Sequence, residues 1–345
     1  MSSSDGGLTG VGADFAGTAV KVALRVRPLM AFEMANNNTS VVDYPDKKQL
    51  SIGANAAKKR AFTFDHVYNE NSTQEEVYNT SCKSLVDSYL EGYNATILAY
   101  GQTGSGKTHS MGTAATATTN ANGDSELVLC APSDGIIPRV MRQIFETIRS
   151  RQLTHEYTIQ VSYVELHNED LICLLTPLDA RRADLTIRES NGDVQVMGAA
   201  RVTVESFEQM GACLERGSLN RTVASTNMNA TSSRSHAIFT VYLAQKKLSA
   251  RGRRLRACSV AAGMASATAA ADAAAAAAAN SANPGDENGS PSAVTSPTAA
   301  SANAAAAAAA SGEAEDVTEE VLVSKFNFVD LAGSERLKRT GAQVR

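Results

Sequence analysis

The residues with the clearest chemical signature stand at positions 101–108, where the sequence reads GQTGSGKT. This octapeptide fits the pattern GxxxxGK[ST] and follows an apolar stretch (TILAY, 96–100) that is typical of a strand. Glycines let consecutive backbone N–H groups curl around phosphate oxygens, while the final lysine and threonine supply a charge for the β- and γ-phosphates and a hydroxyl for Mg²⁺. A plain glycine-rich turn is the alternative. We predict a phosphate-binding loop made of Gly101, Gln102, Thr103, Gly104, Ser105, Gly106, Lys107 and Thr108.

A second candidate for the same site is Asp330, which follows the apolar stretch VLVSKFNFV and opens the sequence DLAG. An acidic residue at the end of a strand can hold the water shell of Mg²⁺, and a glycine three residues later can donate its N–H group to a terminal phosphate. DxxG is common by itself, but a phosphate loop in the same chain makes it informative. We therefore predict that Asp330 serves the metal and that Gly333 senses the γ-phosphate.

A third candidate is the hydroxyl-rich segment NATSSRSH at positions 229–236. Clusters of Ser and Thr are ordinary turn material, which is the alternative interpretation. Arg234 stands among these hydroxyl groups, directly before another apolar stretch that begins at residue 237. This arginine makes the segment a candidate part of the nucleotide site.

The elements that must position these segments follow from hydrophobic periodicity. Alternating or continuous apolar residues predict strands, and a capping box at Ser72 and Glu75 predicts a helix that Gly92 ends. The expected strands cover residues 19–27, 61–68, 96–100, 157–166, 237–244 and 321–329, and further helices cover 136–149 and 205–216. Strands that alternate with helices, several of them almost wholly apolar, predict an α/β sheet covered on both faces.

Residues 249–318 interrupt this pattern with low-complexity sequence. The stretch contains two runs of seven alanines, opens with basic residues and closes with acidic ones. Alanine favours helix, but these runs offer little side chain to pack and are broken by Asn, Pro, Gly and Ser. We interpret 249–318 as a solvated surface loop at the tip of a hairpin, with a functional tether as the alternative. Residues 1–17 form a small-residue leader, which leaves one large domain over 18–345.

The composition excludes several classes of protein. Of the 345 residues, 43% are hydrophobic and the net charge is −4, so a substantial core is expected and a generally basic nucleic-acid binder is disfavoured. The five cysteines contain no CxxC pair, which indicates a reducing cytosol rather than a disulfide framework or a zinc site. The sequence lacks a secretory leader and an apolar stretch of about 18 residues, so no membrane segment is expected.

Three of these segments together resemble a known family. The stretches GYNATILAYGQTGSGKTHSMG (92–112), NATSSRSHAIFTVYL (229–243) and FVDLAGSERLKRTGA (328–342) are similar to the phosphate loop, first switch and second switch of kinesin motor domains. Supporting pieces are RVRPL (25–29), FTFDHVY (62–68), GIIPRV (135–140) and SYVELHNEDLICLL (162–175). The resemblance covers residues 20–248 and 321–342, and the ending ERLKRTGA is similar to the chromokinesin-type branch.

This resemblance implies the fold and the site residues. The fold would be a P-loop NTPase of the kinesin type, a central mixed sheet flanked by helices on both faces. ATP and Mg²⁺ would be the ligands, with Arg25, Pro28 and His109 at the adenine. Thr108 and Ser233 would be ligands of the metal, and Asp330 would stand behind a metal-bound water. The expected catalytic residues are Ser232, Ser233, Arg234, Gly333 and Glu335, where Arg234 and Glu335 form a salt bridge and Glu335 accepts a proton through a second water.

The implied activity is a microtubule-stimulated ATPase that drives movement, in the cytoplasm and on the microtubule cytoskeleton. Alternatives are a non-translocating kinesin that remodels microtubules, an inactive tubulin-binding fragment, and a simple P-loop kinase, which would not explain SSRSH. The expected microtubule-binding helix, one central strand and the neck segment have no counterpart before residue 345. The resemblance therefore implies an incomplete motor domain over 18–345, with dimerisation through a coiled-coil stalk elsewhere. Arg181, Arg182 and Arg188 are candidate tubulin contacts, and 113–134 is expected to be a surface loop.

Overall fold

The structure is a computed structural model that describes residues 20–54, 59–113, 117–119, 125–127, 133–177, 185–190, 192–227, 232–260 and 321–335. The expected leader at 1–17, residues 261–318 of the insertion, Arg181 and Arg182 lie outside these ranges.

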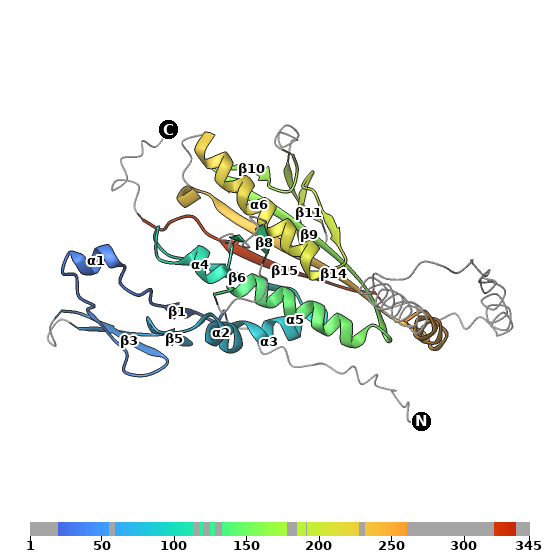
Figure 1. The fold of residues 1–345 in the computed structure, drawn as a ribbon, viewed down its shortest axis with the longest axis horizontal. Coiled ribbons are helices and arrows are strands. Elements are labelled where there is room, and N and C mark those ends of the chain that lie inside the picture. The colour runs from blue at the N-terminus through green and yellow to red at the C-terminus, as the bar shows by residue number, and fades with distance from the viewer. Residues whose placement is uncertain are drawn as a thin grey trace, which may run out of the picture.

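The centre of the molecule is a six-stranded mixed sheet with the strand order β10-β9-β14-β15-β6 (Figure 1). The sixth strand, β13, pairs with residues 159–161 of β9, whereas β10 pairs with residues 164–167. Its strands are β6 (Ala95–Ala99), β9 (His155–His167), β10 (Asp170–Cys173), β13 (Val202–Val204), β14 (His236–Lys247) and β15 (Val321–Asp330). Among these six strands, only the β15–β6 pair is parallel, and its register places Asp330 beside Ala99. Parallel strands end at the same edge of a sheet, so the predicted phosphate loop after β6 and the DLAG segment after β15 begin side by side.

The insertion connects two antiparallel neighbours, as the hairpin interpretation predicted. Strands β14 and β15 pair along ten residues, from Ala237 opposite Asp330 to Lys246 opposite Val321. The start of the insertion differs from the expected loop, because residues 250–260 form a helix. Alanine, arginine and leucine, which make up most of this segment, all have high helix propensity.

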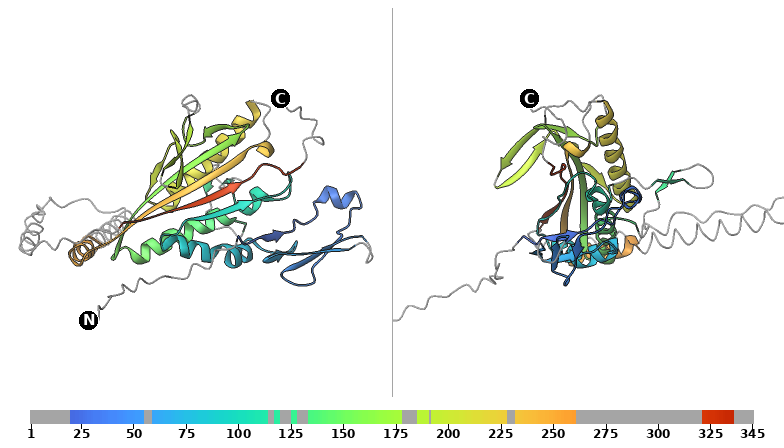
Figure 2. Two further views of the ribbon diagram at one scale, coloured as in Figure 1. Left: turned by 180° about the vertical axis from the view of Figure 1, so that it is seen from behind. Right: turned by 90° about the vertical axis from the view of Figure 1, so that its left-hand side faces the viewer.

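The described helices that pack on the central sheet lie in a row on one of its faces (Figures 1 and 2). They are α3 (Lys83–Leu90), α4 (Lys107–Met111), α5 (Ile136–Arg151) and α6 (Phe207–Asn227), and the short helix α2 (Gln74–Val77) precedes α3. A π-helical turn, Tyr78–Cys82, joins α2 to α3. We expected helices on both faces of the sheet. In the described part of the chain, the helices cover one face of it. On the opposite face, Leu98 of β6 is 59% exposed.

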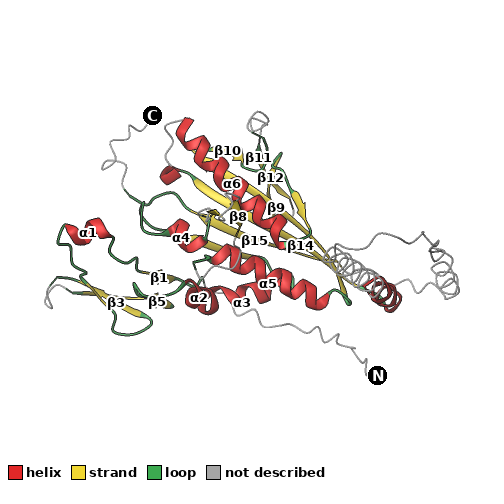
Figure 3. Cartoon of the chain, in the orientation of Figure 1, coloured by secondary structure: helices red, strands yellow, loops and turns green. Residues whose placement is uncertain are grey.

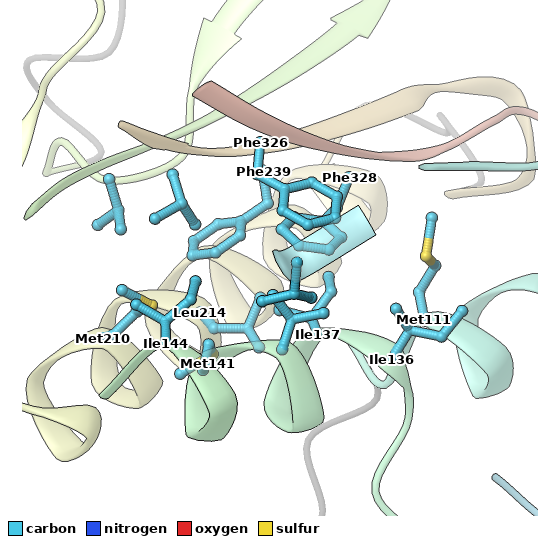
Figure 4. Close-up of a cluster of buried hydrophobic side chains, with 14 of the residues drawn as sticks. Met111, Ile136, Ile137, Met141, Ile144, Met210, Leu214, Phe239, Phe326 and Phe328 are labelled. Atoms are coloured by element: carbon cyan, nitrogen blue, oxygen red, sulfur yellow. The ribbon is translucent and has the colours of Figure 1, made fainter. Parts of the chain in front are cut away.

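The core lies between this row of helices and the sheet (Figure 4). Phe239, Phe326 and Phe328 project from β14 and β15, and each is at most 1% exposed. The rings of Phe326 and Phe328 stack with centroids 4.5 Å apart. Met141 and Ile144 of α5 meet these rings from the other side and are fully buried. Close packing of this kind makes β14 and β15 a rigid support for the loops at their ends.

A smaller lobe stands beside the sheet and consists of short strands and one short helix (Figure 3). Here β1 (Ala23–Arg25) pairs in parallel with β5 (His66–Tyr68), and β2 (Val42–Asp43), β3 (Gln49–Ile52) and β4 (Arg60–Thr63) form an antiparallel sheet near α1 (Ala31–Ala35). The expected single strand 61–68 is therefore two strands in different sheets. Asp65 separates them, since its side chain and backbone bond Val22.

Two further hairpins have no counterpart in the sequence-based expectations. Strands β7 (Ala117–Thr119) and β8 (Ser125–Leu127) pair within the expected surface loop, and β11 (Thr186–Ser190) pairs with β12 (Asp193–Met197). Arg188, a candidate tubulin contact, lies exposed on β11.

Two helix boundaries also differ from the expectation. The N-cap of α2 is Thr73, whose hydroxyl accepts a hydrogen bond from the Glu76 N–H group, so the capping residue is one position later than Ser72. Helix α6 extends to Asn227, well beyond the predicted end at residue 216. Among the helices that the structure describes, none has the length and hydropathy of a membrane span.

Candidate nucleotide-binding site

The phosphate loop connects β6 to α4 at the edge of the sheet where β15 also ends. Gly101, Gly104 and Gly106 have φ angles of 155°, 77° and 100°, which residues with side chains rarely adopt. At Gly101 a Cβ atom would lie 2.6 Å from the Ser105 hydroxyl oxygen. The loop therefore needs glycine at this position for both its backbone angle and its close packing.

Lys107, the first residue of α4, folds back over the loop. Its ammonium group donates hydrogen bonds to the carbonyl oxygens of Gly101 and Gln102, at 2.9 and 3.0 Å. The positive charge is thereby held against the loop that we predict to bind phosphates.

The next residue, Thr108, joins the phosphate loop to β15. Its hydroxyl donates a 2.9 Å hydrogen bond to Oδ2 of Asp330, which is only 4% exposed. Oδ1 of Asp330 has no hydrogen-bond partner among the described residues. A threonine hydroxyl beside a carboxylate whose second oxygen is buried without a hydrogen-bond partner in the described part of the chain is a pair of hard ligands of the kind that Mg²⁺ prefers.

The two expected switch segments touch each other and the phosphate loop. The Gly333 N–H group donates to the Ser233 carbonyl oxygen at 2.7 Å, and the Ala332 N–H group donates to Nδ1 of His236 at 3.1 Å. The Ser334 N–H group bonds the Gly101 carbonyl oxygen at 3.1 Å. Three segments that are distant in the sequence therefore meet at one place. Ser232 begins the short 3₁₀ turn Ser232–Arg234 that carries Ser233 into this contact.

Glu335 lies on the phosphate loop and not on Arg234. Its carboxylate accepts a 2.9 Å hydrogen bond from the Thr103 N–H group and another from the Thr103 hydroxyl. These bonds, with a smaller effect of the Lys107 charge, lower the pKa of Glu335. Among the described residues no ion pair joins Arg234 to Glu335, and Arg234 is exposed. The structure thus differs from the expected salt bridge, because Thr103 already satisfies both carboxylate oxygens.

The residues expected at the adenine are connected through Gln74. Arg25 donates hydrogen bonds to the Gln74 side chain at 2.7 Å and to the Ser110 hydroxyl at 3.0 Å. The Gln74 amide nitrogen lies 3.1 Å from Nε2 of His109 and donates to the His109 carbonyl oxygen at 2.8 Å. Burial, and then the Arg25 charge, lower the pKa of His109, so the ring is neutral at neutral pH. Pro28 lies exposed three residues beyond the end of β1.

Sequence reasoning missed three functional candidates here. Gln74 bridges Arg25 and His109, while Arg221 and Glu165 are buried next to Asp330. Arg221 lies on α6, beyond the predicted end of that helix, and is only 7% exposed. The sequence signal that could have found Arg221 is a charged residue that falls on the apolar side of a helix. Such a residue is buried, and a buried charge nearly always has a partner of opposite charge.

Comparison with protein families agrees with this geometry. The model of the kinesin motor domain matches residues 25–268. The kinesin-like protein KIF27 of Mus musculus is 38% identical over 324 residues, which cover 93% of this chain and 18% of that protein. The chromosome-associated kinesin KIF4A of Homo sapiens is 41% identical over 242 residues, which cover 70% of this chain and 18% of that protein. This chain thus spans about a fifth of the length of these relatives.

A solved structure of a fast kinesin, described for its ATPase mechanism and its interactions with microtubules, superimposes with a TM-score of 0.64. It is 27% identical, and the match covers 95% of this chain and 69% of that one. The fold, the contacts between three loops and the family match over most of the chain lead to the same conclusion. The chain belongs to the kinesin motor domain family.

Proposed function

We propose that this chain is the ATP-hydrolysing part of a microtubule motor, in which the two switch loops sense the γ-phosphate and couple it to movement. The observation that carries the proposal is the meeting of three separated segments at one site. Thr108 bonds Asp330 at 2.9 Å, and Gly333 bonds Ser233 at 2.7 Å. A kinase with a phosphate loop would not need the second contact, whereas a device that must detect one phosphoryl group does.

The donor set fits ATP with Mg²⁺. The loop glycines and Lys107 offer N–H groups and a positive charge for phosphates. The hydroxyls of Thr108 and Ser233 and the buried Oδ1 of Asp330, which has no partner among the described residues, offer hard oxygens. Thr108 and Ser233 would ligate the metal, and Asp330 would hold a water of its shell. When bound, Mg²⁺ neutralises charge on the phosphate oxygens. Arg25, Pro28 and His109 would receive the adenine, with Gln74 fixing two of them.

The remaining residues position the reactants, because phosphoryl transfer asks little covalent chemistry of a protein. Ser232 and Ser233 would order the attacking water, and Arg234 with Glu335 would close the site over it. Glu335 would then take the proton through a second water. In this scheme Arg234 and Glu335 must approach each other, which requires Glu335 to leave Thr103.

Movement would follow from contacts that only the γ-phosphate makes. The Gly333 N–H group donates to Ser233 in the structure, and the γ-phosphate would compete for this donor. Exchange of one acceptor for the other would shift the segment 331–335 relative to the sheet. Residence on the microtubule cytoskeleton in the cytoplasm and dimerisation through a stalk belong to the same proposal, since the family implies them and no described contact does.

The test is ATP turnover by the full-length protein with and without microtubules. We expect microtubules to stimulate turnover and Lys107→Ala to reduce it by a factor of about 10² or more, as removal of a charged donor from a reaction centre does. Lys83→Ala, an exposed lysine on α3, is the matched control. Turnover that ignores microtubules would contradict the proposal, and single-filament imaging would separate directed travel from shortening of filament ends.

A further inference from the structure

The contact between Glu335 and Thr103 involves both carboxylate oxygens of Glu335 and both donor groups of Thr103, its backbone N–H group and its hydroxyl. Oε2 of Glu335 accepts from the Thr103 N–H group at 2.9 Å, and Oε1 accepts from the Thr103 hydroxyl. A threonine thus holds a carboxylate by two bonds, although the two residues are 232 positions apart in the sequence.

Gly333 makes this contact sterically feasible. A Cβ atom at Gly333 would overlap both the Glu335 carboxylate and the Thr103 hydroxyl. The Ser334 N–H group, bonded to the Gly101 carbonyl oxygen at 3.1 Å, anchors the backbone between Gly333 and Glu335. The position of the Glu335 carboxylate therefore depends on the backbone of residues 333–335 as well as on the Glu335 side chain itself.

The Thr103 N–H group belongs to the phosphate loop, so a carboxylate bound there occupies a donor of an anion site. A phosphate that enters the loop needs the same kind of donor and carries the same sign of charge. The Lys107 ammonium, whose charge helps to lower the pKa of Glu335, is already bonded to the carbonyl oxygens of Gly101 and Gln102. Glu335 and the phosphates of a nucleotide would therefore compete for the loop.

We propose that Thr103 is a positioning residue that holds Glu335 on the phosphate loop, and that entry of nucleotide phosphates frees Glu335 to pair with Arg234. The inference rests on the proposed nucleotide site. It gives Thr103 a role opposite to that of an ordinary phosphate ligand, because the Thr103 hydroxyl then stabilises the state that excludes phosphate. Arg234, exposed and not paired with Glu335, is the residue to which the freed carboxylate moves.

The direction of an affinity change separates these two roles. Thr103→Val removes the hydroxyl but keeps the backbone N–H group and the branched shape. We expect Thr103→Val to bind Mg²⁺–ADP and Mg²⁺–ATPγS about three to ten times more tightly than the unaltered protein, the range for the loss of one hydrogen bond. Thr103→Ser, which restores the hydroxyl, should return the dissociation constant to the original value. Weaker binding by Thr103→Val would overturn the inference.

A second variant tests the partner. Glu335→Gln keeps the shape but removes the charge, so it should also tighten binding, and the double variant Thr103→Val with Glu335→Gln should bind no more tightly than the tighter single variant. Full additivity would overturn the inference, because it would mean that the two residues act separately. Binding by the unaltered protein is the reference: its absence would overturn this inference and the proposed function together, whereas weaker binding by Thr103→Val alone overturns only the inference.

Discussion

The guanidinium of Arg221 donates a hydrogen bond to Oδ2 of Asp330 at 3.2 Å, and both side chains are buried. The same guanidinium lies 3.7 Å from Oε1 of Glu165 and donates to the Ser235 carbonyl oxygen at 3.0 Å. Helix α6 is thereby connected to β9, to the start of β14 and to the end of β15. Arg221, which no sequence motif contains, therefore bonds the same oxygen of Asp330 that accepts the hydrogen bond of Thr108.

Removal of Arg221 should destabilise the domain strongly. Arg221→Met leaves the carboxylates of Glu165 and Asp330 buried without their cation, and the expected loss is about 3–5 kcal/mol in the free energy of unfolding. Urea unfolding followed by circular dichroism measures it. Glu165→Gln is the matched variant, since it keeps Arg221 on Asp330. A loss for Arg221→Met no larger than that for Glu165→Gln would contradict the importance of the Arg221–Asp330 pair.

The phosphate loop should be more sensitive to an added methyl group at Gly101 than a hairpin is at Gly192. A Cβ atom at Gly101 would lie 2.6 Å from the Ser105 hydroxyl, whereas Gly192, with a φ of 76°, has nothing within 4 Å of such an atom. Gly192→Ala should therefore cost about 1 kcal/mol of stability through its backbone angle alone and leave nucleotide affinity unchanged. Gly101→Ala should weaken nucleotide binding about tenfold or more. Equal nucleotide affinities in isothermal titration calorimetry would refute this difference.

His109 should make stability depend on pH below neutrality. Its pKa in the folded protein is lowered by burial and by Arg25, so the unfolded chain binds the proton more readily. The stabilising effect of the neutral ring is complete above the ordinary pKa of about 6.5 and is lost as the pH falls through 6.5 toward the lowered value. Protonation would also deprive Gln74 of the acceptor at Nε2. Thermal unfolding between pH 7.5 and about 5 should show a steeper decline for the unaltered protein than for His109→Gln, and parallel curves would be inconsistent with this role.

Arg234 and Glu335 should act as one unit in turnover. If they form a pair when ATP is hydrolysed, Arg234→Ala, Glu335→Ala and the double variant should each lower kcat by about the same factor, on the order of 10² to 10³. Lys83→Ala again serves as the control. Losses that multiply in the double variant would show that the two side chains work independently and do not pair during catalysis.

The sequence alone determined the parts of the site that are local. A glycine-rich loop between an apolar strand and a helix needs particular backbone angles, and GQTGSGKT contains the residues that can adopt them, so its role follows from spacing within eight positions. The same holds for β14 and β15, because their apolar patterns are long. The parallel pairing of β6 and β15 then brings Asp330 beside Ala99 through backbone geometry.

Only the tertiary structure decided which side chains meet across long separations. Gln74 and Arg25 are 49 residues apart, Arg221 and Asp330 are 109 apart, and Thr103 and Glu335 are 232 apart. No periodic pattern in a chain specifies such pairs. Hydrophobic packing sets the positions of the helices and strands, and the polar side chains that meet at the edge of the core follow from those positions. The resting place of Glu335 shows this most directly: the sequence named the residue, and the folded chain placed it on the phosphate loop.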